Sequence, residues 1–171
     1  MNVILIGYRG CGKTTVGQRL ADRLWQTFAD VDDLIVRRAG KTIKQIFEQD
    51  GEAHFRDLET AALREALAMT DKVIGVGGGI VVREENRKLI KESGLKVIYL
   101  KCEPAVLEKR IREDPATTQT RPPLTPHGGN LEEILQRLAE REPLYRQLMT
   151  AELEVTNLTM DEAVHHISRM I

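Results

Sequence analysis

The chain has 171 residues, about the size of one domain, and we expect residues 1–171 to fold as a single domain around one core. Its hydrophobic content of 42% with 30% charged residues is ordinary for a globular protein and argues against a disordered or fibrous chain. The formal net charge of -1 gives no general positive field for a nucleic-acid backbone, so an anionic ligand would need a local cluster of cations.

The first predicted element is a strand over Val3 to Ile6. This apolar stretch is too short for a signal peptide, and no run elsewhere approaches the length of a membrane-spanning helix. We therefore expect a cytoplasmic protein with no membrane partner and, given its charge, no nucleic-acid partner. The two cysteines, Cys11 and Cys102, lie far apart without a CxxC pair, which predicts neither a zinc site nor a disulfide.

The loop after this strand reads GYRGCGKTT and matches the phosphate-loop (Walker A) pattern GxxxxGK[ST], placed between a strand and a helix as nucleotide binding requires. Its glycines let backbone N–H groups converge on phosphate oxygens, and the helix presents its positive end to the same anion. Lys13 would neutralise the β- and γ-phosphates, and Thr14 would offer its hydroxyl to Mg²⁺. The residues expected to hold the nucleotide are Gly10, Cys11, Gly12, Lys13, Thr14 and Thr15.

The phosphate loop alone does not define the fate of the nucleotide. A GTPase switch should contain NKxD and DxxG, and the sequence contains neither tetrapeptide. The stretch Gly75 to Gly77 begins the glycine pattern of a dinucleotide fold, but Ile80 stands where the third glycine should be. The remaining candidates are a kinase and a module that binds a nucleotide without catalysis.

The second predicted strand ends near Phe28 and leads into the sequence FADVDDL. In an extended conformation, Asp30 and Asp32 would project to one side at the carboxyl end of the strand, where α/β sheets bind ligands. We predict that Asp30 holds hydrated Mg²⁺ and that Asp32 orients or deprotonates an attacking hydroxyl. An acidic helix N-terminus is the alternative interpretation. Just before this strand, Trp25 is expected to pack at the end of the first helix.

A helix is predicted over residues 52–69, where apolar residues recur at helical spacing. Near its start stands Arg56, with Glu59 three residues on to steady its guanidinium. A second arginine, Arg141, lies just before Pro143, which should break or kink the long helix around it. Because arginine pairs with both oxygens of a carboxylate, the two arginines are candidates to bind an anionic acceptor, although each alone would also suit a solvated surface.

The third predicted strand, Val73 to Val76, ends in three glycines, Gly77 to Gly79, where a phosphate-binding protein would usually place an acidic metal ligand. We interpret the glycines as bare backbone that forms the floor of the acceptor's pocket. A side chain at Gly78 or Gly79 would then occupy the acceptor's space.

Two further strands, Val97 to Leu100 and Leu153 to Val155, complete a pattern of strands alternating with helices. This pattern predicts an α/β fold, a three-layer α/β/α domain with a central five-stranded parallel sheet. Between the two strands, the stretch Asp114 to Gly129 holds four of the six prolines and has no periodicity. It is either a surface insertion or a lid, and the prolines that fix the backbone around Arg121 favour a lid that presents this cation.

These stretches together resemble the shikimate kinase family along nearly the whole chain, through GYRGCGKTT, FADVDD, EAHFRDLE, VGGG, RPPLT and EREPLY in this order. The family transfers the γ-phosphate of ATP to the 3-hydroxyl of shikimate, a step of aromatic amino acid synthesis, and its fold resembles that of the nucleoside monophosphate kinases. The resemblance implies a P-loop kinase that uses Mg²⁺ held by Thr14 and Asp30. It also implies a substrate-binding region at about 31–60, a mobile lid at about 112–129 and a monomer.

The resemblance further implies roles for individual residues at the acceptor. Asp32 would bind shikimate hydroxyls and act as the candidate base. Arg56 and Arg141 would bind the carboxylate of shikimate, and Gly78 and Gly79 would add backbone contacts.

On the nucleotide side, the resemblance implies that Lys13 and Arg121 stabilise the transferring phosphoryl group. Arg110 would stack on the adenine of ATP, and Thr156 with Asn157 would complete that pocket. Other small-metabolite or nucleotide kinases, such as gluconate kinase, remain the alternative enzymes, although two carboxylate-directed arginines argue against a neutral sugar. A regulatory ATP-binding module would leave Asp32 and Arg121 without a task.

Overall fold

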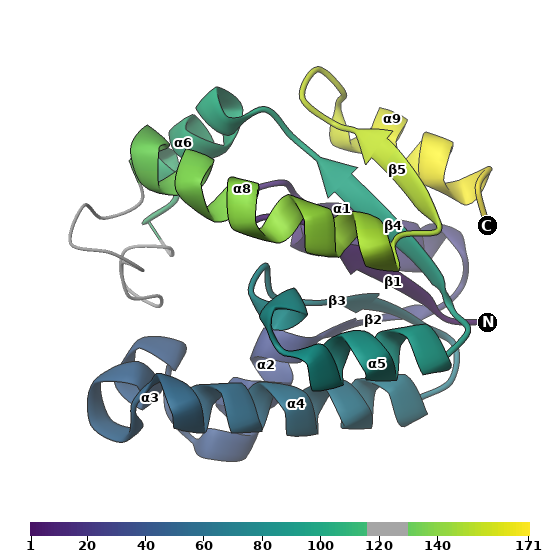
Figure 1. The fold of residues 1–171 in the computed structure, drawn as a ribbon. Helices are drawn as coiled ribbons and strands as arrows, with labels where there is room; N and C mark the ends of the chain where they lie inside the picture. Colours follow the sequence, from purple (N-terminus) through teal and green to yellow (C-terminus); the bar gives the residue numbers. More distant parts are fainter. Residues whose placement is uncertain (116–129) are drawn as a thin grey trace.

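A five-stranded parallel sheet in the order β2-β3-β1-β4-β5 forms the centre of the molecule, in a computed structural model that describes residues 1–115 and 130–171 (Figure 1). The strands are β1 (Val3–Ile6), β2 (Thr27–Asp30), β3 (Lys72–Gly75), β4 (Lys96–Lys101) and β5 (Ala151–Glu154). The central strand β1 consists of four apolar residues that are all buried, as expected for a strand covered on both faces. The predicted α/β class and five-stranded parallel sheet are confirmed, with strand ends that differ by one or two residues.

Helices cover both faces of the sheet, with α1 and α9 on one face and α5 and α8 on the other (Figure 1). The described helices are α1 (Lys13–Arg23), α2 (Val31–Ala39), α3 (Ile43–Asp50), α4 (Glu52–Ala68), α5 (Glu84–Glu92), α6 (Pro104–Glu113), α8 (Leu131–Leu148) and α9 (Met160–Ser168), with a short 3-10 helix η1 (Ile80–Val82). None of these helices has both the length and the apolar content needed to cross a bilayer.

Helix α8 carries Arg141 and was expected to break or kink at Pro143. The helix instead runs on to Leu148, so a break at this proline was the wrong prediction. Proline removes one backbone donor, but apolar residues on both sides of it, Leu138 and Tyr145 among them, are buried in the core and hold the helix against the sheet. Arg141 is therefore fixed on a continuous helix.

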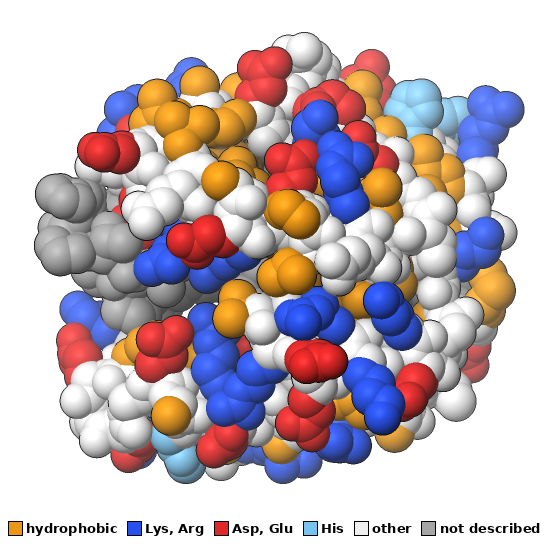
Figure 2. Space-filling model, in the orientation of Figure 1, with side chains coloured by type: hydrophobic (Ala, Val, Ile, Leu, Met, Phe, Trp, Pro, Cys, Tyr) orange, Lys and Arg blue, Asp and Glu red, His pale blue; other side chains and the backbone are white. Residues whose placement is uncertain are grey.

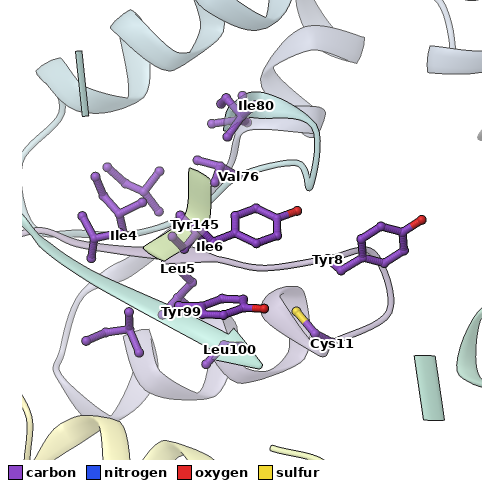
Figure 3. Close-up of a cluster of buried hydrophobic side chains, with 14 of the residues drawn as sticks. Ile4, Leu5, Ile6, Tyr8, Cys11, Val76, Ile80, Tyr99, Leu100 and Tyr145 are labelled. Carbon is purple, nitrogen blue, oxygen red and sulfur yellow. The ribbon is translucent and has the colours of Figure 1, made fainter. Parts of the chain in front are cut away.

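The core beside the site is built around two tyrosines from different elements. The rings of Tyr99 on β4 and Tyr145 on α8 stack with centroids 5.1 Å apart, and Figure 3 shows them among the apolar side chains of β1, with Cys11 in the same cluster. Both side chains are almost wholly buried, which fixes α8 on this face of the sheet. Trp25, by contrast, is 96% exposed at a left-handed backbone position (φ 56°), so the expectation that it packs at the end of α1 is wrong.

The ring of Phe28 sets the position of β2 in the sheet. A β-carbon on Gly17 of α1 would lie 2.2 Å from this ring, and one on Gly75 of β3 would lie 2.7 Å from it. Only glycine at both positions leaves room for the ring, because real side chains do not approach so closely. Phe28 thereby holds Asp30, two residues further along β2, beside the start of α1.

Candidate active site

The carboxyl ends of β2, β3 and β1 meet at one edge of the sheet. Asp30 is in register with Gly75, and Gly75 is in register with Leu5, so the segments that follow these three strands lie next to one another. Those segments are the phosphate loop, the start of α2 and the three glycines Gly77 to Gly79. The edge where α/β sheets bind ligands therefore carries the three stretches that the sequence singled out.

The phosphate loop borders a cavity of about 370 Å³. Its glycines Gly10 and Gly12 have φ of 86° and 96°, in the left-handed region that favours glycine. The ammonium of Lys13 donates to the carbonyl oxygens of Gly7 and Tyr8, at 2.8 and 3.0 Å, so it supports the loop's own backbone. The predicted nucleotide residues that line this cavity are Gly10, Gly12, Lys13, Thr14 and Thr15.

Cys11 is the exception among the predicted nucleotide residues. Its side chain is 1% exposed and packs toward Gly7, where a β-carbon would lie 2.8 Å from the sulfur. The thiol therefore faces the core, and only the backbone of Cys11 is available to a phosphate.

Asp30 and Asp32 of the FADVDDL stretch reach the site by different routes. Strand β2 ends at Asp30, whose Oδ1 accepts the backbone N–H of Asp32 at 2.9 Å and so caps α2. The prediction that both residues are extended is therefore wrong, because α2 has already begun at Val31. Asp32 lies in the first helical turn, is 8% exposed, and still lines the phosphate-loop cavity.

Two oxygen groups beside the phosphate loop could hold Mg²⁺. Thr14 Oγ1 donates to Asp30 Oδ2 at 3.3 Å, so a hydroxyl and a carboxylate face the same point. Mg²⁺ prefers such oxygen ligands and usually keeps several waters and substrate phosphates in its shell. Since no group of three His, Cys, Asp or Glu suited to a metal occurs in residues 1–115 and 130–171, phosphate and water oxygens would supply the rest. The residues present fit this ion.

A second pocket adjoins the phosphate-loop cavity between α2, α3, α4 and α8. Its described lining consists of Tyr8, Arg9, Asp32, Ile43, Phe47, Phe55, Arg56, Glu59, Gly77, Gly78, Gly79 and Arg141. Arg56 and Arg141, 85 positions apart in the sequence, thus lie in one pocket, together with Asp32 and the three glycines.

Both arginines of this pocket are held in place by neighbours. Arg56 Nη1 donates to Glu59 Oε1 at 2.8 Å, and Glu59 is 1% exposed. Burial raises the pKa of Glu59 above its usual range, and the Arg56 guanidinium opposes that rise. Arg141 is 7% exposed and lies over the ring of Tyr8, 5.9 Å from the centroid. Two guanidinium groups that are fixed in one pocket can together bind a carboxylate.

The three glycines make close approaches that the sequence did not suggest. A β-carbon on Gly79 would lie 2.7 Å from Arg56 Nη1, and one on Gly78 would lie 3.2 Å from the backbone nitrogen of Arg9 in the phosphate loop. A β-carbon on Gly77 would lie 3.2 Å from Asp32 Oδ1. A side chain here would therefore disturb Arg56, the phosphate loop and Asp32 before it reached an acceptor.

Tyr145 is a site residue that the sequence analysis missed. Its hydroxyl donates to the carbonyl oxygen of Gly78 at 2.5 Å, although the two residues are 67 positions apart. Tyr145 stands four residues after Arg141 on α8, and residues at this spacing share a helix face. That spacing within EREPLY was the available signal.

The phosphate-loop cavity is also lined by Arg110, Ile111, Asp114 and Met160. Arg110 was predicted, and its Nη1 donates to the carbonyl oxygen of Gly10 at 3.3 Å. Thr156 and Asn157 are not among the described lining residues, and Thr156 Oγ1 instead accepts the backbone N–H of Glu103 at 2.9 Å. Arg121 and residues 116–129 of the predicted lid lie outside the described residues.

The sequence of the chain is similar to those of known proteins of one family. A family model for shikimate kinase matches residues 9–171. Shikimate kinase from Rhodopirellula baltica is 39% identical over 166 residues, which cover 97% of this chain and 88% of the relative. The enzyme from Oleidesulfovibrio alaskensis is 45% identical over 146 residues, 85% of this chain and 83% of the relative.

Solved structures agree with these sequence matches. The structure of shikimate kinase from Acinetobacter baumannii in complex with shikimate superposes with a TM-score of 0.91 at 32% identity, covering 99% of this chain and 91% of that one. The chain therefore belongs to the shikimate kinase family.

Proposed function

We propose that the protein transfers the γ-phosphoryl group of ATP to the 3-hydroxyl of shikimate, and that the residues described above carry out this reaction. Membership of the family makes the protein a kinase with shikimate as its acceptor. The observation that carries the residue assignment is that Arg9, Asp32 and Gly77 line both the phosphate-loop cavity and the pocket that holds Arg56 and Arg141. An acceptor in one cavity would therefore meet a phosphate in the other.

The acceptor would be positioned by its carboxylate. Arg56 and Arg141 supply planar, doubly donating groups for it, and Gly77 to Gly79 leave flat backbone beside the ring. A hydroxyl at the opposite side of the ring would then reach Asp32. Holding both reactants in line converts the transfer into an effectively unimolecular step.

In that step Asp32 accepts the proton of the attacking hydroxyl. The hydroxyl oxygen forms a bond to the γ-phosphorus while the bond from that phosphorus to the bridging oxygen of ADP breaks. Lys13 and Arg121 would stabilise the charge on the moving phosphoryl group, for which Lys13 must exchange at least one loop carbonyl for a phosphate oxygen. Mg²⁺, held by Thr14 and Asp30, would neutralise charge on the phosphates when bound.

The remaining assignments belong to the same proposal. Arg110 would bind the adenine end of ATP, and residues 31–60 would form the acceptor region, since α2, α3 and the start of α4 supply its wall. Residues 112–129 would act as a lid over the nucleotide. The protein would work in the cytoplasm as a monomeric single domain in aromatic amino acid synthesis.

The test mixes the purified protein with ATP, Mg²⁺ and each acceptor of a panel in turn, and measures the ADP that is released. Shikimate should be phosphorylated, whereas gluconate and nucleoside monophosphates should release no more ADP than a reaction without acceptor.

Arg56→Ala should raise the KM for shikimate roughly ten- to hundredfold and leave the KM for ATP unchanged, because a charge-assisted pair is worth about 1.5–3 kcal/mol. The control is Arg64→Ala on the same helix, whose partner Glu85 lies at the surface. An equal loss of affinity for both substrates in Arg56→Ala would overturn the assignment.

A further inference from the structure

A third cavity, of about 310 Å³, adjoins the pocket that holds Arg56 and Arg141, which we call the acceptor pocket. It has none of its described lining residues in common with the phosphate-loop cavity. We call it the outer cavity, and its described lining is Phe47, Glu52, Arg56, Val82, Arg137, Glu140 and Arg141. It shares Phe47, Arg56 and Arg141 with the acceptor pocket. The two arginines are therefore reachable from both cavities, and the acceptor pocket lies between the outer cavity and the phosphate loop.

Charged residues from two helices face each other across the outer cavity. On α4, Glu52 lies 3.5 Å from Arg56, and on α8, Glu140 lies 3.2 Å from Arg137. With Arg141, the lining holds three guanidinium groups and two carboxylates, a local excess of positive charge in a chain whose net charge is -1. Figure 2 shows Lys and Arg side chains gathered on this face between the level of α8 and that of α4.

We propose that the outer cavity is the entrance through which the carboxylate acceptor reaches its pocket, and that Arg137 attracts the acceptor's anion there. Arg137 precedes Arg141 by one helical turn, so the two guanidiniums lie on the same side of α8. A carboxylate could pass from Arg137 to Arg141 and Arg56 without leaving positive surroundings. ATP in the phosphate-loop cavity would not block this path, so shikimate could bind and its product could leave with nucleotide in place. The inference rests on the proposed acceptor site at Arg56 and Arg141.

If positive charge in the outer cavity attracts the acceptor, removing an arginine and removing a glutamate there should change kcat/KM for shikimate in opposite directions. Arg137→Gln should lower kcat/KM for shikimate about two- to threefold at low salt, and Glu140→Gln should raise it by a similar factor, because each removes one charge near the path. Both effects should vanish at about 1 M salt, where the screening length is about 3 Å. The kcat and the KM for ATP should not change. Arg146→Gln on the same helix, paired with Glu142 and Glu152 outside the cavity, is the control.

The path itself is tested by blocking it. Val82, 50% exposed, lines the outer cavity but not the acceptor pocket. Val82→Trp should lower kcat/KM for shikimate at least fivefold at every salt concentration and leave kcat/KM for ATP unchanged. Val36→Trp, at a half-exposed position on α2 that lines none of these cavities, should behave as the unmodified protein.

The outcomes separate this inference from the proposed function. If Arg56→Ala leaves the KM for shikimate unchanged, the acceptor site itself is wrong. If Arg56→Ala acts as expected but Val82→Trp has no effect, shikimate enters elsewhere and the entrance is overturned. If Arg137→Gln and Glu140→Gln change kcat/KM in the same direction, or keep their effects at high salt, Arg137 does not act by attracting the anion. Opposite, salt-sensitive effects together with a block by Val82→Trp support the proposal.

Discussion

The guanidinium of Arg56 fills the space beside the α-carbon of Gly79, so that a β-carbon there would lie 2.7 Å from Nη1 and 2.8 Å from Nη2. The guanidinium is thus packed against the α-carbon of Gly79 and also forms an ion pair with Glu59. These two neighbours together fix its position. Gly79 has φ of -91°, which any residue can adopt, so space rather than backbone freedom requires glycine at this position.

Gly79→Ala should displace Arg56 and raise the KM for shikimate about tenfold, with the KM for ATP unchanged. The double variant with Arg56→Ala is the control, because a methyl that acts only through Arg56 should add little once that side chain is gone. Steady-state kinetics of the three variants give the KM for shikimate of each. If the increase in KM of the double variant equals the product of the increases of the two single variants, the methyl acts on the acceptor directly.

Glu59→Gln should change how both shikimate binding and stability depend on pH. The carboxyl faces Arg56, Arg141 and Asp32, and burial raises its pKa above the ordinary value of 4.5. In the unmodified protein, Glu59 takes up a proton as pH falls through this raised pKa and loses its ion pair with Arg56, so the KM for shikimate should rise. In Glu59→Gln the KM should be higher and should not respond to this titration.

The stability difference has a defined sign. Because the folded-state pKa of Glu59 is raised, the unfolded chain releases this proton first as pH rises above 4.5. The unmodified protein should therefore lose free energy of unfolding relative to Glu59→Gln between pH 4.5 and the raised pKa. Urea unfolding of both proteins across this range measures the difference, and parallel curves would contradict the assignment.

Tyr145→Phe should weaken shikimate binding without unfolding the protein. The substitution leaves the carbonyl of Gly78 without the hydroxyl's hydrogen bond, at a cost of about 1–3 kcal/mol, and loosens the glycine segment that borders the acceptor pocket. We expect a several-fold higher KM for shikimate and an unchanged KM for ATP. Tyr99→Phe is the control, since its ring stacks on that of Tyr145 and the substitution likewise removes one hydroxyl from a buried tyrosine. Equal effects of the two variants on KM would assign Tyr145 a packing role only.

Asp30→Asn should raise the Mg²⁺ concentration needed for half-maximal activity, because the amide replaces a charged oxygen ligand by a neutral one. Asp30 also caps α2, and asparagine retains that capping ability, so the melting temperature should fall little. Titration of activity with MgCl₂ at saturating ATP measures the shift. An unchanged Mg²⁺ requirement would place the carboxylate outside the metal site.

The phosphate loop could be predicted because its strand, glycines and helix are contiguous, so one short pattern contains the whole arrangement. The conformation at Asp30 was wrong for an equally local reason. Aspartate is a preferred N-cap, and FADVDD is as compatible with a helix that starts after Asp30 as with a longer strand. The acidic residues of this stretch thus indicated the site, whereas the sequence did not distinguish between the two backbone conformations.

Contacts between distant segments could not be predicted in the same way. Phe28 fits between Gly17 and Gly75, and Gly79 fits against Arg56, because several elements pack to within a few tenths of an ångström. A single sequence shows each glycine but not the side chain that requires it. Trp25 shows the converse, because a large apolar residue at a helix end predicted burial and the side chain lies in solvent.

The strand order has a consequence for synthesis on the ribosome. Strand β1 is made first, but both of its neighbours come much later, since Val3 pairs with Val73 on one side and Lys96 on the other. Until β3 has emerged, four consecutive apolar residues have no partner and are available to chaperones or to other nascent chains. The phosphate loop, which directly follows β1, can therefore acquire its final shape only after the chain has been translated at least as far as Gly75.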